Sequence, residues 1–216
     1  NVRIVLPAAS DYVPYRDYIG SHLELMDGET GKRKIIYTVK NSIQAPNWTR
    51  DNQALIYNSE GLIYRYDLAT NKTTLLPTDF AKRNNNDHVL SFEGTMLGLS
   101  SSSGESKYGS LIYTVPIDGG IPKKITPIGP SYLHGWSPDG KWLTFTGGRN
   151  KVYDIYKISS DGSGAVIKLT HEPTLDDGSE YSPDGNFIYF NSARTGSMEL
   201  WRMQADGSQQ EQLTDD

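Results

Sequence analysis

Ser137-Pro138-Asp139-Gly140 and Ser182-Pro183-Asp184-Gly185 are the same tetrapeptide, repeated 45 residues apart in the chain. Two weaker copies precede them, Thr49-Arg50-Asp51-Asn52 and Ser91-Phe92-Glu93-Gly94, at intervals of 42 and 46 residues. A constant period in this range is typical of propellers and solenoids. The sequence therefore predicts a repeat protein in which four similar units follow one another.

Each tetrapeptide is a turn signal with a physical cause. Proline at the second position presets φ, aspartate accepts backbone hydrogen bonds, and glycine tolerates the left-handed conformation that closes a tight hairpin. A large apolar residue precedes each turn: Trp48, Leu90, Trp136 and Tyr181. Three short β-prone segments follow each turn, at 54–57, 62–64 and 74–76; at 96–99, 111–113 and 124–126; at 142–145, 154–156 and 168–170; and at 187–190, 199–201 and 212–214. Each repeat thus reads as a blade of four strands, and blades repeated radially form a β-propeller.

The full motif is a large apolar residue, Ser-Pro-Asp-Gly, a β run, Ile-Tyr or Leu-Trp, Asp-Gly and Leu-Thr. It resembles the repeat of TolB-like β-propellers, and the resemblance covers residues 20–216. The copies at 136–170 and 181–214 match closely, whereas the copy at Trp48 keeps only the aspartate of the turn and the copy at Leu90 has Phe92 in place of proline. The resemblance implies an all-β fold, a single β-propeller domain of four-stranded antiparallel blades over residues 1–216.

We expect about five blades in this chain. Blade 1 is partial at 1–40, and blades 2 to 5 occupy 41–80, 81–127, 128–171 and 172–216. Rings of this family have six blades, so we expect an incomplete ring and a C-terminal blade that is missing from this sequence. The alternative is a closed five-bladed ring whose first blade is completed by residues 1–20. Within blade 1, segments 22–26 and 34–38 flank Asp27-Gly28 and predict a hairpin, and Val2–Leu6 is either a strand that closes the ring or a loosely held arm.

Composition excludes several classes of protein. The 36% of apolar residues and the net charge of −5 argue against a disordered chain and against a basic surface for nucleic acid. No apolar run approaches the length of a membrane span. The absence of cysteine rules out disulfides and thiolate metal sites, and the absence of a Gly-x-Ser-x-Gly motif argues against a serine hydrolase site of that type.

The candidate site follows from the geometry of a propeller, because the strand before each turn lines the central channel. Counting three residues back from the first residue of two adjacent turns gives His88 and His134, which predicts two histidines at equivalent channel positions. The polar residues around them define a ligand-binding site at the channel mouth: Asn85, Asn86, Asp87, His88, Tyr132, His134, Asp176 and Asp177. Histidine with carboxylates suits a divalent metal, for which His88 and His134 are the candidate ligands. The alternative is that these side chains only hydrogen-bond the loops between blades and that the protein has no cofactor.

Three functions remain open at this stage. The resemblance to TolB implies a non-catalytic scaffold that binds a protein or peptide partner in the periplasm. Oligogalacturonate lyases are propellers of a related repeat type with histidines and a divalent metal in the channel. By that resemblance, His88 and His134 could serve a metal-assisted carbohydrate enzyme acting on an oligosaccharide. The third alternative is an accessory propeller of a peptidase.

Overall fold

The computed structural model describes residues 19–104 and 109–215. The chain forms two compact units, residues 1–43 and residues 44–216. The predicted closing strand at Val2–Leu6 lies outside the described residues. The prediction of a single domain over 1–216 stays a prediction.

The first unit contains one antiparallel hairpin. Strand β1 (Ser21–Met26) pairs with β2 (Arg33–Val39), with a bulge between Leu23 and Glu24. The turn is held by Asp27, whose Oδ1 accepts hydrogen bonds from the backbone N–H groups of Glu29 (3.1 Å) and Thr30 (2.7 Å). The hairpin predicted from segments 22–26 and 34–38 is confirmed.

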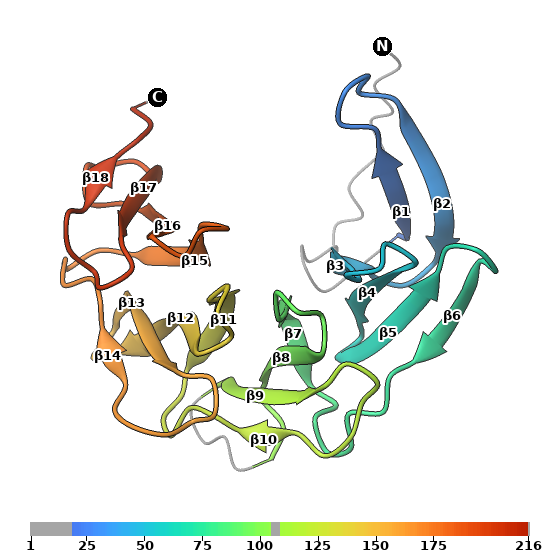
Figure 1. Ribbon diagram of the computed structural model, residues 1–216, viewed down its shortest axis with the longest axis horizontal. Helices are drawn as coiled ribbons and strands as arrows, with labels where there is room; N and C mark the ends of the chain where they lie inside the picture. The colour runs from blue at the N-terminus through green and yellow to red at the C-terminus, as the bar shows by residue number, and fades with distance from the viewer. Residues whose placement is uncertain (1–18, 105–108, 216) are drawn as a thin grey trace, which may run out of the picture. The chain divides into compact units, whose positions relative to one another are not determined.

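The second unit consists of four sheets of four strands each (Figure 1). The first sheet holds β3 (Gln44–Trp48), β4 (Ala54–Ser59), β5 (Leu62–Asp67) and β6 (Lys72–Leu75). The second holds β7 (Asn84–Leu90), β8 (Met96–Ser101), β9 (Leu111–Pro116) and β10 (Lys123–Lys124). The third holds β11 (Ser131–Trp136), β12 (Trp142–Arg149), β13 (Val152–Ser159) and β14 (Ile167–Lys168). The fourth holds β15 (Asp176–Tyr181), β16 (Phe187–Ser192), β17 (Glu199–Gln204) and β18 (Glu211–Gln212).

Every sheet is an antiparallel meander in which neighbours in sequence are neighbours in space. Within this unit the sheets follow one another as an arc, with β7, β11 and β15 on its inner side (Figure 1). The first strands β3, β7, β11 and β15 contact one another in this order. Residues 19–104 and 109–215 contain no helix, and thus none that could cross a membrane. The predicted blades of an all-β propeller are confirmed.

The repeated turn has the same geometry in close and weak copies. In the third sheet, Ser137 Oγ donates to Asp139 Oδ1 (2.6 Å) and accepts from the backbone N–H of Trp142 (2.8 Å). In the first sheet, Thr49 Oγ1 donates to Asp51 Oδ1 (2.6 Å), and Asn52 takes the left-handed φ of 56° that glycine takes elsewhere. A hydroxyl at the first position and a residue that tolerates positive φ at the fourth are therefore enough to form the turn.

The apolar core lies between neighbouring sheets. Leu143, Phe145 and Ile158 of the third sheet pack with Ile112 of the second, and all four are buried. Polar side chains on each second strand also bond the main chain of the next sheet's first strand. Asn58 Nδ2 donates to the Asn84 carbonyl (3.2 Å), Leu133 N donates to Ser100 Oγ (2.8 Å), and Thr144 Oγ1 donates to the Ser179 carbonyl (3.1 Å). These bonds hold the first strands at fixed positions along the inner side.

Each first strand also contains a β-bulge, and the bulge of β7 lies farther from its turn than those of the other three first strands. The pairing shifts between Gln44 and Asn47 in β3, between Asn84 and His88 in β7, between Leu133 and Gly135 in β11, and between Asp177 and Glu180 in β15. A bulge inserts an extra residue and turns the following side chains to the other face. Equal offsets from the turn are therefore not equal positions in space.

Candidate functional site

A polar pocket of ≈250 Å³ lies where three successive first strands meet. Its walls are formed by Asp87 of β7, Tyr132 and His134 of β11, Thr146 of β12, Tyr153 of β13, Asp177 of β15, and Leu175, which directly precedes β15. Four of the eight predicted site residues are thus brought together: Asp87, Tyr132, His134 and Asp177. The pocket opens to solvent and combines acidic, imidazole, hydroxyl and aromatic groups.

The pair of His134 and Asp177 is the centre of this pocket. His134 Nε2 lies 3.0 Å from Asp177 Oδ1, an ion-pair distance. The same oxygen accepts hydrogen bonds from Thr146 Oγ1 (2.7 Å) and from the backbone N–H of Gly178 (2.9 Å). Two hydrogen bonds and the ion-pair contact on one oxygen fix the carboxylate, while its Oδ2 has no partner among the described residues.

Asp87 is held on the other side of the pocket by its own strand. Its Oδ2 accepts a hydrogen bond from Asn85 Nδ2 (2.6 Å), and its Oδ1 accepts one from Asn86 Nδ2 (2.9 Å). Burial raises the pKa of Asp87, and the positive charge of His134 and the bond from Asn85 act against this rise. The carboxyl group is thus oriented by two amides within the bulged segment of β7.

Electrostatics couple the imidazole to three carboxyl groups. Burial alone would lower the pKa of His134, but the contact with Asp177 and the charges of Asp87 and Glu180 outweigh it, so the pKa lies above its ordinary value. For Asp177, burial acts upward, but the contacts with His134 and Thr146 prevail and the pKa is lowered. At neutral pH the pair therefore favours its charged form.

Glu180 belongs to this charge group, although it does not line the pocket. Glu180 is exposed as a residue, yet neighbouring atoms remove water from its carboxyl group. This burial raises the pKa of Glu180 to about 7, while His134 acts in the opposite direction. Gly135 makes the arrangement possible, because a Cβ there would lie 2.3 Å from Thr144 Oγ1 and 2.7 Å from the Ser179 carbonyl. The glycine lets β15 approach β11 closely.

His88 does not occupy the position in its sheet that His134 occupies in the next sheet. It pairs with Leu99, whereas the residue of β11 at the equivalent register is the buried Leu133, paired with Phe145. His88 is only 3% exposed, and its Nδ1 and Nε2 face the carbonyl oxygens of Asn86 (3.1 Å) and Ile56 (3.5 Å). Burial lowers the pKa of His88, so the ring is neutral at pH 7. Its place is between two sheets, and it does not line the pocket.

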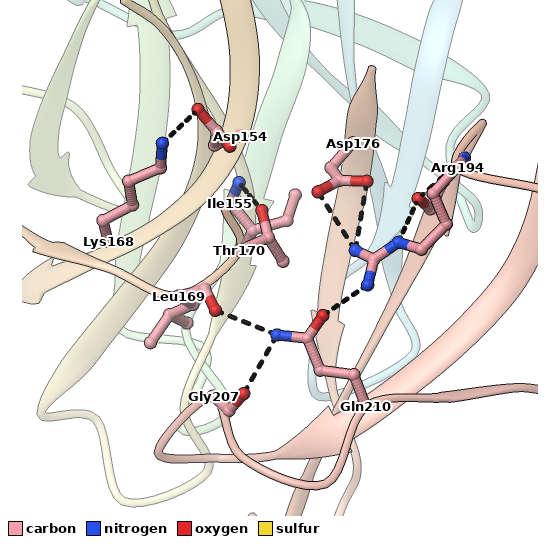
Figure 2. Close-up of polar contacts among 10 residues, drawn as sticks. Asp154, Ile155, Lys168, Leu169, Thr170, Asp176, Arg194, Gly207 and Gln210 are labelled. Carbon is pink, nitrogen blue, oxygen red and sulfur yellow. Dashed lines mark hydrogen bonds and ion pairs between the residues drawn. The ribbon is translucent and has the colours of Figure 1, made fainter. Parts of the chain in front are cut away.

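Asp176 is buried in a different network (Figure 2). Its side chain is 0% exposed and forms an ion pair with Arg194, with 3.2 Å between Nη2 and Oδ2. Arg194 also donates to Gln210 Oε1 (2.6 Å) and Ser192 Oγ (2.8 Å), and Gln210 Nε2 donates to the Leu169 carbonyl (3.0 Å). Asp176 therefore anchors the start of β15 to the neighbouring sheet, while the adjacent Asp177 enters the pocket.

Asn86 is exposed, and it orients Asp87 without lining the pocket. Sequence reasoning missed Thr146, Tyr153, Leu175 and Glu180. Thr146 lies directly opposite Tyr132 in the pairing of β11 with β12, and Tyr153 lies opposite Gly148 in the pairing of β12 with β13. Only the register of the sheet could have indicated these two residues.

The residues do not fit a metal held jointly by His88 and His134. Both nitrogens of His88 face main-chain carbonyls, so no lone pair is directed toward the pocket. In the part of the chain that the structure describes, no three His, Asp or Glu side chains are grouped as ligands for a metal ion. The metal hypothesis stays a prediction, and no chemistry is derived from it.

The fold and pocket define a class: a β-propeller of four-stranded blades with a polar site on the inner strands of adjacent blades. The sequence profile of the TolB β-propeller domain matches residues 134–216. A solved structure from Agrobacterium tumefaciens, provisionally assigned as TolB, is 44% identical, with a TM-score of 0.85 over 89% of this chain and 69% of that chain. This chain belongs to the TolB-like β-propeller family.

Two further comparisons limit what membership of this family implies for the chain. TolB from Acinetobacter baumannii has the same fold, with a TM-score of 0.75 and 23% identity over 89% of this chain and 48% of that chain. An uncharacterized protein of Agrobacterium fabrum is 44% identical over 162 residues, which are 74% of this chain and 54% of that protein. The chain thus spans about half the length of this curated relative.

Proposed function

We propose that this chain is a non-catalytic propeller that binds a peptide segment of a partner protein at the pocket of Asp87, Tyr132, His134 and Asp177. The observation that carries the proposal is the convergence of these side chains from β7, β11 and β15 on one open pocket. A rigid scaffold that presents polar and aromatic groups at a concave site suits recognition of an extended segment. Membership of the TolB-like family supports a role in the periplasm.

The internal arrangement favours binding over catalysis. Asp177 Oδ1 already accepts hydrogen bonds from Thr146 and Gly178 and contacts His134, so its position is fixed before any ligand arrives. Fixed groups bind with a smaller loss of conformational entropy. Asp177 Oδ2 and the two tyrosines that line the pocket remain for a ligand.

The test is selection of peptides from a random library against the purified chain, followed by affinity measurement with pocket variants. We expect Tyr132→Ala and His134→Ala to weaken the selected peptides by about tenfold or more, as loss of interface anchors commonly does. Trp48→Ala is the control, because this aromatic side chain is 48% exposed and lies in the first sheet of the unit. Peptides that bind all three variants as well as the unchanged chain, or a failure of any peptide to bind, would refute the proposal.

A further inference from the structure

The pocket contains more negative than positive groups. Of the described residues that line or adjoin it, Asp87, Asp177 and Glu180 are acidic, and His134 supplies the one basic side chain. Tyr132 and Tyr153 are the remaining titratable groups. When all three carboxyl groups are ionised, the net charge is negative even with a protonated imidazole.

We infer that this pocket takes the ammonium or guanidinium head group of a basic side chain, an inference that rests on the proposed function and specifies its ligand. The acceptor for that head group is Asp177 Oδ2, which has no partner among the described residues. Asp177 is 47% exposed at its side chain, so a ligand can reach it. A charge-assisted hydrogen bond to such a carboxylate is about twice as strong as a neutral one.

The walls and the size of the pocket agree with this class of ligand. Tyr132 and Tyr153 both line it, and aromatic faces attract cations. The volume of ≈250 Å³ is below the ~300–1,000 Å³ typical of pockets for drug-sized ligands. It suits the end of one side chain better than a chain of sugar rings.

The chain does not fill this pocket with a cation of its own. No lysine or arginine is among the described residues that line the pocket, and Arg149 and Arg194 are used elsewhere. Arg149 donates from Nη1 to the Pro130 carbonyl (2.6 Å) and from Nη2 to Ser131 Oγ (3.0 Å). Arg194 is paired with Asp176. The acidic groups are therefore left for a cation from outside.

The net charge of the pocket determines how the binding of a charged ligand changes with pH. As pH rises, His134 loses its positive charge and Glu180 gains its negative charge, so the pocket becomes more negative. The lowered pKa of Asp177 keeps this group ionised, loss of the proton of Asp87 acts in the same direction as that of Glu180, and Tyr132 stays neutral because burial raises its pKa. A cationic ligand should bind more tightly from pH 6 to pH 8, whereas an anionic ligand should bind more weakly.

The experiment follows the ring signals of labelled histidine by NMR, since the chain has only four histidines. The probes are acetyl-Gly-Lys-Gly-amide and acetyl-Gly-Arg-Gly-amide, with the same tripeptides carrying Gln or Glu as comparisons. We expect a basic probe to shift the His134 signals saturably, at least about tenfold more tightly than the Gln probe at pH 8, because bonds to charged groups contribute more. Binding should weaken at pH 6.

Asp177→Asn removes the charge at nearly constant size and should lose this preference, and Asp87→Asn provides a second test if the first variant is unstable. Asp118→Asn, an exposed residue of the loop after β9, changes the net charge equally and should bind as before. Equal binding of the Gln and Lys probes, tighter binding of the Glu probe, or no response to any tripeptide would overturn the inference. So would a response of His134 to MnCl₂ alone. Library peptides that bind at the pocket without enrichment of Lys or Arg would also overturn it and leave the proposed function standing.

Discussion

Arg194→Ala should be among the most damaging single substitutions in the second unit. Asp176 is 0% exposed, and its carboxylate contacts Arg194 Nη2 at 3.2 and 3.4 Å. The guanidinium also stacks over the rings of Phe190 and Trp201, at 5.4 and 4.6 Å from their centroids. Removing one partner of a buried ion pair leaves an uncompensated charge and typically costs about 3–5 kcal/mol. We expect a loss of this size in the free energy of unfolding.

The assay is urea unfolding, monitored by circular dichroism and by tryptophan fluorescence. Coincident transitions from the two signals would show that unfolding is two-state. Asp176→Asn in the Arg194→Ala background should recover part of the loss, because the unpaired buried charge is then gone. Arg202→Ala, in the same sheet, removes an arginine paired with the exposed Glu211 and should have far less effect. A loss below about 1 kcal/mol for Arg194→Ala, or strict additivity of the double variant, would refute the reasoning.

Three other predictions follow from the same geometry. Gly135→Ala should lower the melting temperature, because the added Cβ would clash with Thr144 and overpacking typically costs about 1–3 kcal/mol. Gly28→Ala is the control and should leave the melting temperature unchanged in the same thermal scan, because no atom lies within 4 Å of the added Cβ. Ser137→Ala should cost about 1 kcal/mol in urea unfolding because the hydroxyl of this buried residue makes two hydrogen bonds in the turn, and an unchanged midpoint would contradict this. Because the pKa of Glu180 is raised from 4.5 to about 7, its contribution to stability is complete below pH 4.5 and is lost as pH rises to 7. Glu180→Gln should flatten that decline in unfolding experiments across pH, and an unaltered slope would show that Glu180 does not cause it.

The repeated sheets could be predicted from sequence because each depends on local signals. The turn needs only a hydroxyl, an acceptor and a residue that tolerates positive φ, and it therefore forms at Thr49 to Asn52 despite the loss of proline and glycine. The strands after each turn show the apolar residues that a half-buried strand requires. These features do not depend on how one sheet meets the next.

The candidate site was less predictable because it depends on register between strands. Asp176 and Asp177 are adjacent in one strand, and alternation places their side chains on opposite faces, so only one of them could enter the pocket. That much could have been inferred from the sequence. The displacement of His88 relative to His134 could not, because the bulges of β7 and β11 lie at different positions and have no distinct sequence signal.

The bulge of β7 lies farther from its turn than the bulge of β11, and this difference has a consequence for how such proteins diverge. A single inserted or deleted residue next to His134 would exchange the set of side chains presented to the axis, while the hairpin and the three outer strands keep their pairing. Specificity can thus change in one mutational step while the outer strands of the sheet stay paired. Combinatorial libraries that vary strand length at this point would sample new recognition surfaces that side-chain substitution alone cannot reach.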